Sequence, residues 1–171
     1  WECTKPIQTY TLTKGIKQPL VGLDWMLRKQ GPGRTNHLQA GGFLKTRKEL
    51  DRPDIQLHFI NAVMINHAKE KADRDGFTIH SCQLRPESRG EVKLGSNDPF
   101  ANPLIDPKYM SSDVDRATLR DSVRMVRDII GQEAMADYRG PEMRPGAHVR
   151  TDAEIDAWSR RSAETIYHPV G

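Results

Sequence analysis

The stretch RPDIQLHF, residues 52–59, decides the fold class of this chain. Its first three residues, Arg52-Pro53-Asp54, are typical of a turn. After the turn, apolar residues at 55, 57 and 59 alternate with Gln56 and His58, which is the period of a half-buried β-strand. If the three apolar side chains pack on the core, Gln56 and His58 face the opposite side, toward water or a cavity.

Further extended segments flank this strand in the sequence. Residues 38–46 predict a short one, in which Gly41-Gly42 would allow a bulge or a close backbone approach. Residues 77–84 are another β-rich run, and the turn signal Glu87-Ser88-Arg89-Gly90 leads into an alternating segment at 91–94. These two segments predict a hairpin. Residues 98–109 hold three prolines and show no period, which predicts an irregular connection.

Three segments have the periodicity of helices. Residues 15–30 carry leucines at 20, 23 and 27, and Gly31-Pro32-Gly33 ends that helix. Residues 112–132 give the clearest helix, and a further one begins at the capping box Thr151-Asp152-Ala153-Glu154, with Ile155 and Trp158 directed inward. The apolar stripe of the 112–132 helix consists of Leu119, Val123, Val126 and Ile130. Strands joined by hairpins, with helices after them, predict an α+β fold: a mostly antiparallel β-sheet backed by helices, in one domain over residues 1–171.

Composition excludes several classes of partner. The 171 residues include 26 basic and 23 acidic ones, a net charge of +3, which is too balanced for a nucleic-acid-binding surface. No apolar run reaches the roughly 18 residues of a membrane span. Two cysteines, Cys3 and Cys82, predict a reduced intracellular protein and not a disulfide framework. Since the sequence starts at Trp1 without an initiator methionine, we expect a piece of a longer protein.

Histidines are the first candidates for chemistry. The residue before a proline is held extended, so His168, before Pro169, lies on a short rigid segment after the last helix. A neutral imidazole placed in this way can take a proton from a hydroxyl group or stabilise an alkoxide. Judged from local sequence alone, an ordinary surface histidine remains the alternative for His168, and a solvated face remains the alternative for His58.

Two further patterns have ordinary explanations. His80 and Cys82 share one face of a strand, and a zinc-dependent hydrolase that uses them with His58 is an alternative function. Zinc needs three or four ligands, no second pair stands at ligand spacing, and we therefore expect no metal site. Four arginines of the 112–132 helix, Arg116, Arg120, Arg124 and Arg127, could bind phosphate. Aspartates on the same helix, at 113, 115, 121 and 128, favour a solvated, salt-bridged face instead.

Several segments, in this order, resemble the glucose–methanol–choline (GMC) oxidoreductases, and among them the choline dehydrogenase-like members. The resemblance covers almost the whole chain. The segments are Glu2-Cys3-Thr4-Lys5-Pro6-Ile7, Gly31-Pro32-Gly33 with Asn36, Ala40-Gly41-Gly42-Phe43, residues 52–59, Arg85-Pro86-Glu87-Ser88-Arg89-Gly90, Asn97-Asp98-Pro99, Pro103-Leu104-Ile105-Asp106-Pro107-Lys108-Tyr109, Tyr138-Arg139-Gly140 and Tyr167-His168-Pro169-Val170-Gly171.

The resemblance implies a function. Family members hold FAD in one domain and cover its reactive face with a substrate-binding domain, which is the part that this chain matches. They oxidise an alcohol to an aldehyde by passing a hydride to flavin N5. By this resemblance His168 is the catalytic base or alkoxide stabiliser, with Pro169 and Val170 beside the flavin. His58, Tyr167, Met64 and Gln39 would line the alcohol pocket.

The resemblance also predicts what this chain does not supply. The FAD-binding domain and a second polar catalytic residue would lie elsewhere in the parent protein, so the isolated chain should be inactive and bind no FAD. Gln39 stands where many relatives carry glutamate, which leaves another primary alcohol open beside choline. A non-catalytic α+β binding module is the remaining alternative. We expect the parent in the cytoplasm, either free or peripheral to the inner membrane.

Overall fold

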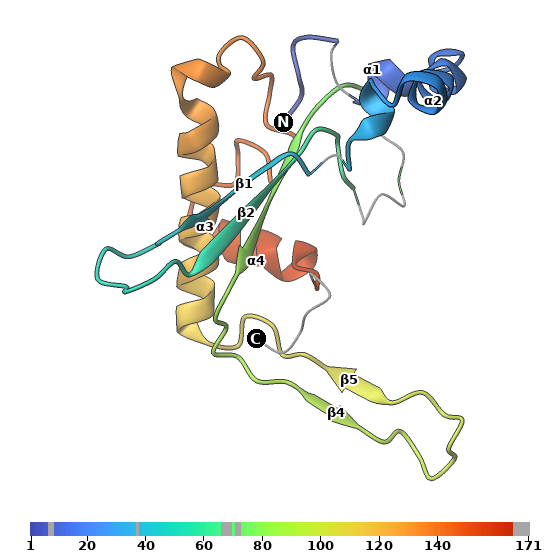
Figure 1. Ribbon diagram of the computed structural model, residues 1–171. Coiled ribbons are helices and arrows are strands. Elements are labelled where there is room, and N and C mark those ends of the chain that lie inside the picture. The colour runs from blue at the N-terminus through green and yellow to red at the C-terminus, as the bar shows by residue number, and fades with distance from the viewer. Residues whose placement is uncertain (7–8, 37, 66–69, 71–72, 166–171) are drawn as a thin grey trace.

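The computed structural model describes residues 1–171 except 7–8, 37, 66–69, 71–72 and 166–171. The described helices and strands follow the α+β pattern that the sequence predicts, with the three-stranded sheet in the first half of the chain and the longest helix, α3, in the second (Figure 1). In chain order they are α1 (Thr9–Thr13), α2 (Lys17–Arg28), the 3₁₀ helix η1 (Pro32–Arg34), β1 (Ala40–Leu44), β2 (Ile55–Ile60), β3 (Thr78–Gln83), β4 (Glu91–Lys93), β5 (Leu104–Asp106), α3 (Asp113–Gly131), η2 (Glu133–Met135) and α4 (Asp152–Ser162).

The main sheet has the order β1-β2-β3, and both pairs of strands are antiparallel. The alternation in β2 is confirmed, because Ile55 and Leu57 are buried while Gln56 and His58 are only half-buried. Ile55 and Leu57 pack with Phe77 and with two residues of α3, Val126 and Ile130. Helix α3 therefore covers one face of the sheet, as Figure 1 shows.

Helix α3 buries a mixed stripe and not a purely apolar one. Of the predicted stripe, Val126 and Ile130 are buried, whereas Leu119 and Val123 are half-buried. The first half of the helix instead buries three polar residues, Asp115, Thr118 and Ser122. Ser122 Oγ lies 3.0 Å from Ser81 Oγ of β3, so a hydrogen bond joins sheet and helix where apolar packing ends.

The carboxylate of Asp115 is the most heavily bonded polar group at this junction. Asp115 was predicted on the solvated face of α3, and this prediction is wrong, since the residue is only 2% exposed. Its Oδ1 accepts hydrogen bonds from Gln83 Nε2 and from the backbone N–H of Glu87, each at 2.8 Å. Its Oδ2 accepts from the backbone N–H of Ser88 at 2.9 Å and from the Ser88 hydroxyl. Burial alone would raise the pKa of Asp115, but these hydrogen bonds outweigh it and lower the pKa below its ordinary value.

The hairpin predicted from residues 77–84 and 91–94 is wrong. Strand β4 pairs with β5 and not with β3. The reason is that Glu87 and Ser88 are held by Asp115, and Ser112, the N-cap of α3, donates to Glu87. These bonds hold the turn at residues 87–88 against the start of α3. The chain after the turn therefore runs away from β3 instead of returning beside it. Residues 98–109 were predicted to be an irregular connection, and this is wrong in part, because they contain β5.

The prediction that the four arginines of α3 lie on a salt-bridged face is confirmed. Each has an acidic partner, and some of these come from other segments: Arg116 pairs with Asp113, Arg120 with Asp152 and Asp156, Arg124 with Asp121 and Asp152, and Arg127 with Glu142. The capping box at Thr151 and Glu154 is also confirmed, and it begins α4. Helix α1 was not predicted.

Two segments expose large apolar side chains. None of the residues of α2 is buried, although Leu20, Leu23 and Leu27 form the predicted helical repeat. The β4–β5 hairpin extends away from the rest of the molecule in Figure 1, with Phe100 93% exposed near its tip. Its other exposed apolar residues are Val92, Leu94, Leu104 and Ile105. Among the described residues, no helix is long and apolar enough to cross a membrane.

The substitution Asp115→Asn tests the junction between sheet and helix. The asparagine amide replaces one accepting oxygen with an NH₂ group, which faces hydrogen-bond donors and leaves them without an acceptor. The free energy of unfolding should therefore fall by about 2–3 kcal/mol. Asp113→Asn is the matched control, because the Asp113 side chain is 95% exposed, and it should change stability by less than about 0.5 kcal/mol. Urea unfolding followed by circular dichroism measures both.

The pH dependence of the free energy of unfolding gives a second test with wild type and Asp115→Asn. Because the pKa of Asp115 is lower in the folded chain than in the unfolded one, its stabilising effect is complete above the ordinary aspartate pKa of about 4. The effect is lost as the pH falls through the folded value. The difference in stability between wild type and Asp115→Asn should therefore shrink below about pH 4, and a constant difference would contradict the assigned role.

Candidate functional site

The sheet face opposite α3 carries the polar side chains that could do chemistry. Register places His58 of β2 opposite Gly41 of β1 and opposite His80 of β3, and residues directly opposite share a face. Gln56 is likewise opposite Phe43 and Cys82 on this face. Phe43 is 59% exposed and His80 is exposed, so this face is partly open.

His58 is the candidate on this face with a polar atom in need of a partner. The residue is half-buried, and its Nδ1 is fully buried with no hydrogen-bond partner among the described residues. Its neighbour Gly41 has no room for a side chain, because a Cβ there would lie 2.6 Å from the carbonyl oxygen of Leu57. A buried nitrogen without a partner is unfavourable by about 1–3 kcal/mol. Such an atom is typical of a site completed by a ligand or by another part of the protein.

The neighbouring Cys82 is not prepared for nucleophilic or metal chemistry. Burial raises the pKa of its thiol, which keeps it protonated at neutral pH. Within the part of the chain that the structure describes, no group of three histidine, cysteine or acidic side chains could hold a metal ion. The zinc-hydrolase alternative built on His58, His80 and Cys82 therefore has no support there.

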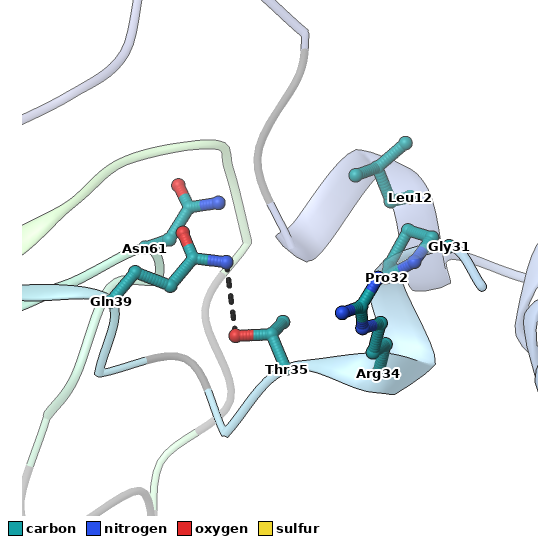
Figure 2. Close-up of a pocket in the computed structure, with 7 residues that line it drawn as sticks. All are labelled: Leu12, Gly31, Pro32, Arg34, Thr35, Gln39 and Asn61. Carbon is teal, nitrogen blue, oxygen red and sulfur yellow. Dashed lines mark hydrogen bonds between the residues drawn. The ribbon is translucent and has the colours of Figure 1, made fainter. Parts of the chain in front are cut away.

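A cleft of about 530 Å³ opens where β1 begins and β2 ends. Its size is within the range of small-molecule sites. Gln39 is the predicted substrate-binding residue found there, and its Nε2 donates to Thr35 Oγ1 at 2.9 Å. The described lining residues, shown in Figure 2, are Leu12, Gly31, Pro32, Arg34, Thr35, Gln39 and Asn61. Because Gln39 comes two residues before Gly41, the cleft lies beside the strand pair that carries His58.

Met64, another predicted substrate-binding residue, does not line this cleft. It lines a smaller cavity of about 70 Å³, whose walls include Trp1 and Phe77, and its backbone N–H donates to Thr78 Oγ1 at 3.0 Å. The described linings of the two cavities share no residue. The structure therefore brings Gln39 close to the His58 strands but does not bring Met64 into the same cavity.

The remaining predicted site residues are His168, Tyr167, Pro169 and Val170. They lie outside the described residues, so their roles stay predictions. Conversely, Arg34, Thr35 and Asn61 line the cleft and were missed from the sequence. Arg34 directly follows a glycine-proline-glycine segment that was understood only as the end of a helix, and no local pattern distinguishes it from any other surface arginine.

The open face carries Phe43, Gln56 and His58, which the strand register places next to one another. A dinucleotide cofactor needs a glycine-rich loop between a strand and a long helix for its pyrophosphate. In the described part of the chain, Gly31-Pro32-Gly33 leads only into the three residues of η1, and Gly41-Gly42 is inside β1. Among the described residues, neither glycine segment therefore has the strand–loop–helix context of a pyrophosphate-binding loop.

Comparisons with known proteins identify relatives of this chain. The chain is 39% identical over 167 residues to mitochondrial choline dehydrogenase of Mus musculus, which covers 98% of this chain and 28% of the relative. It is 40% identical over 169 residues to oxygen-dependent choline dehydrogenase of Acinetobacter baumannii (strain AYE), which covers 99% of this chain and 31% of the relative. The chain thus spans about three tenths of the length of these curated relatives.

Solved structures share the fold at low sequence identity. A formate oxidase matches with a TM-score of 0.77 and 21% identity, over 91% of this chain and 32% of that one. Pyridoxine 4-oxidase from Mesorbium loti matches with a TM-score of 0.64 and 21% identity, over 73% of this chain and 25% of that one. A model of the GMC oxidoreductase family matches residues 86–171, half of the sequence. The chain belongs to the GMC oxidoreductase family.

Proposed function

We propose that residues 1–171 form the substrate-binding domain of an FAD-dependent alcohol oxidoreductase that resembles choline dehydrogenase. The parent enzyme would oxidise an alcohol to an aldehyde. The observation that carries the proposal is the sheet face opposite α3, where the buried Nδ1 of His58 has no partner among the described residues. That face lies beside a cleft large enough for a small alcohol. Family membership supports the same reading.

In this proposal each site residue except Met64 has a stated task. FAD, held by the parent enzyme, would accept the hydride at its N5. His168 takes the hydroxyl proton or stabilises the alkoxide as charge develops on the substrate oxygen. His58 and Gln39 position the alcohol, and Tyr167 adds apolar surface. Met64 has no task in this proposal, because it lines a separate cavity. Pro169 and Val170 would lie next to the flavin.

The partner of this chain would be the FAD-binding domain of the same parent protein. Two observations support this partner. The curated relatives are more than three times as long as this chain, since it covers 28% and 31% of them. The exposed apolar residues of α2 and of the β4–β5 hairpin also need cover, because a two-stranded hairpin is marginally stable alone in water. We place the parent in the cytoplasm, free or peripheral to the inner membrane.

The purified 171-residue chain should contain no flavin. It lacks a described pyrophosphate-binding loop, so it should show no absorbance near the flavin bands and should not oxidise alcohols when FAD is added. Absorbance spectroscopy and an assay with an artificial electron acceptor measure both. Stoichiometric flavin in the purified chain would contradict the assignment of FAD to the rest of the parent.

In the full-length parent, His168→Ala should lower kcat by roughly 10²–10⁴-fold, because a general base is lost. The flavin absorbance and the melting temperature should be retained. His148→Ala is the matched control, since His148 is exposed and its loop is held against α3 by Arg127, on the covered side of the sheet. Equal activities of the two variants would support the non-catalytic binding module instead.

The substitution Phe100→Asp tests the proposed docking of the hairpin. If the FAD-binding domain covers Phe100, a charge there should lower the free energy of unfolding of the parent by roughly 2 kcal/mol or more. In the isolated chain the same change should matter by less than about 0.5 kcal/mol, because Phe100 is 93% exposed. Phe100→Leu is the control that keeps an apolar side chain. If Phe100→Asp leaves the free energy of unfolding of the parent unchanged, the hairpin is not covered by the FAD-binding domain.

A further inference from the structure

The cleft beside the sheet contains one cationic group in its described lining and no anionic one. Arg34 is the cation, and none of the other six described lining residues is charged. Within the described part of the chain, the guanidinium group of Arg34 forms no hydrogen bond or ion pair. In Figure 2 it points toward the space between Leu12 and the Thr35–Gln39 pair. A guanidinium in this position is available to a ligand.

Two described aspartates lie next to lining residues or their chain neighbours, and each already accepts a hydrogen bond from another side chain. Asp24 Oδ2 lies 2.7 Å from the position of a Cβ on Gly31, and Asp24 Oδ1 accepts a hydrogen bond from Arg28 at 3.3 Å. Asp75 accepts hydrogen bonds from the backbone N–H and the hydroxyl of Thr11. Neither aspartate is among the described lining residues of the cleft. The segments outside the described residues contain no aspartate or glutamate in their sequence, so they cannot contribute an acidic side chain to the cleft.

The other polar groups of the cleft suit an anion as well. Gln39 uses one amide N–H for Thr35 Oγ1, and its Nε2 has a second hydrogen. Asn61 brings a second amide to the same cleft, as Figure 2 shows. A guanidinium group forms two parallel hydrogen bonds with a carboxylate, and these are among the strongest in proteins. A quaternary ammonium group instead requires aromatic faces or carboxylates, and the described lining has neither.

From these observations we infer that the cleft binds the carboxylate of an alcohol substrate, with Arg34 as its anchor and Gln39 as a supporting hydrogen-bond donor. This inference rests on the proposed function for the oxidation itself. The preferred substrate of the parent enzyme is then a small hydroxy-carboxylate and not choline. Arg34 becomes a specificity-determining residue that neither the family match nor the sequence pattern identified.

Kinetics of the FAD-loaded full-length parent test the inference with three alcohols of similar size: 4-hydroxybutyrate, 1-butanol and choline. The expected order of kcat/KM is 4-hydroxybutyrate first, 1-butanol second and choline last. Arg34→Gln should raise KM for 4-hydroxybutyrate roughly ten- to hundredfold and leave the values for 1-butanol within about twofold. Arg161→Gln should change none of them, because it removes an equal charge at the end of α4, and Arg161 is not among the described lining residues of the cleft.

Binding without turnover separates this inference from the proposed function. Butyrate and its neutral analogue butyramide are titrated into the FAD-loaded parent by calorimetry. Butyrate should bind more tightly than butyramide, and Arg34→Gln should abolish the difference, whether or not any alcohol is oxidised. Failure of every alcohol to reduce the flavin would overturn the proposed function alone. Choline as the preferred substrate, or equal binding of butyrate to wild type and Arg34→Gln, would overturn the carboxylate site.

Discussion

The buried carboxylate of Asp115 is the interaction on which the arrangement of the molecule depends. Its two oxygens bind the last residue of β3 and the backbone of the turn at residues 87–88, while the residue itself belongs to the first turn of α3. A negative charge at this end of a helix is also favoured by the exposed backbone N–H groups there. One side chain thus fixes the sheet, the turn and the helix relative to one another. The turn, held in this way, sends the β4–β5 hairpin away from the sheet.

This junction leaves the two faces of the sheet with different properties. The face toward α3 is closed by apolar packing of Ile55 and Leu57 and by the Ser81–Ser122 hydrogen bond. The opposite face keeps a polar nitrogen of His58 buried and unsatisfied by any described residue. A stable fold can tolerate one such atom because the closed face supplies the stability, and the open face is then free to bind a ligand.

Much of the fold could be predicted from the sequence because its signals are local. The alternation around His58 needs only a period of two residues, and the capping box at Thr151 needs only four positions. The pairing of β4 with β5 could not be predicted in the same way. Each strand has three residues, too few for a clear period, and their pairing follows from hydrogen bonds made by Asp115 to a turn 27 and 28 positions away.

The candidate site was predictable in part for the same reason. The side of the sheet on which His58 lies follows from the alternation of one strand, whereas Gln39 was named only through the family resemblance. Arg34 and Asn61 belong to separate segments that meet only in the folded chain, so no local pattern joins them. The exposure of α2 was also beyond prediction, because a helical repeat of leucines is the same whether it packs within this chain or against another domain.

The most direct test of the account is a crystal structure of the full-length parent enzyme with FAD. The account predicts that the sheet face with Gln56 and His58 lies toward the flavin ring, with the cleft at Gln39 opening to the same space and α2 and the hairpin covered by the FAD-binding domain. A flavin on the α3 side of the sheet, or a face at His58 filled by polypeptide without access to the flavin, would contradict it.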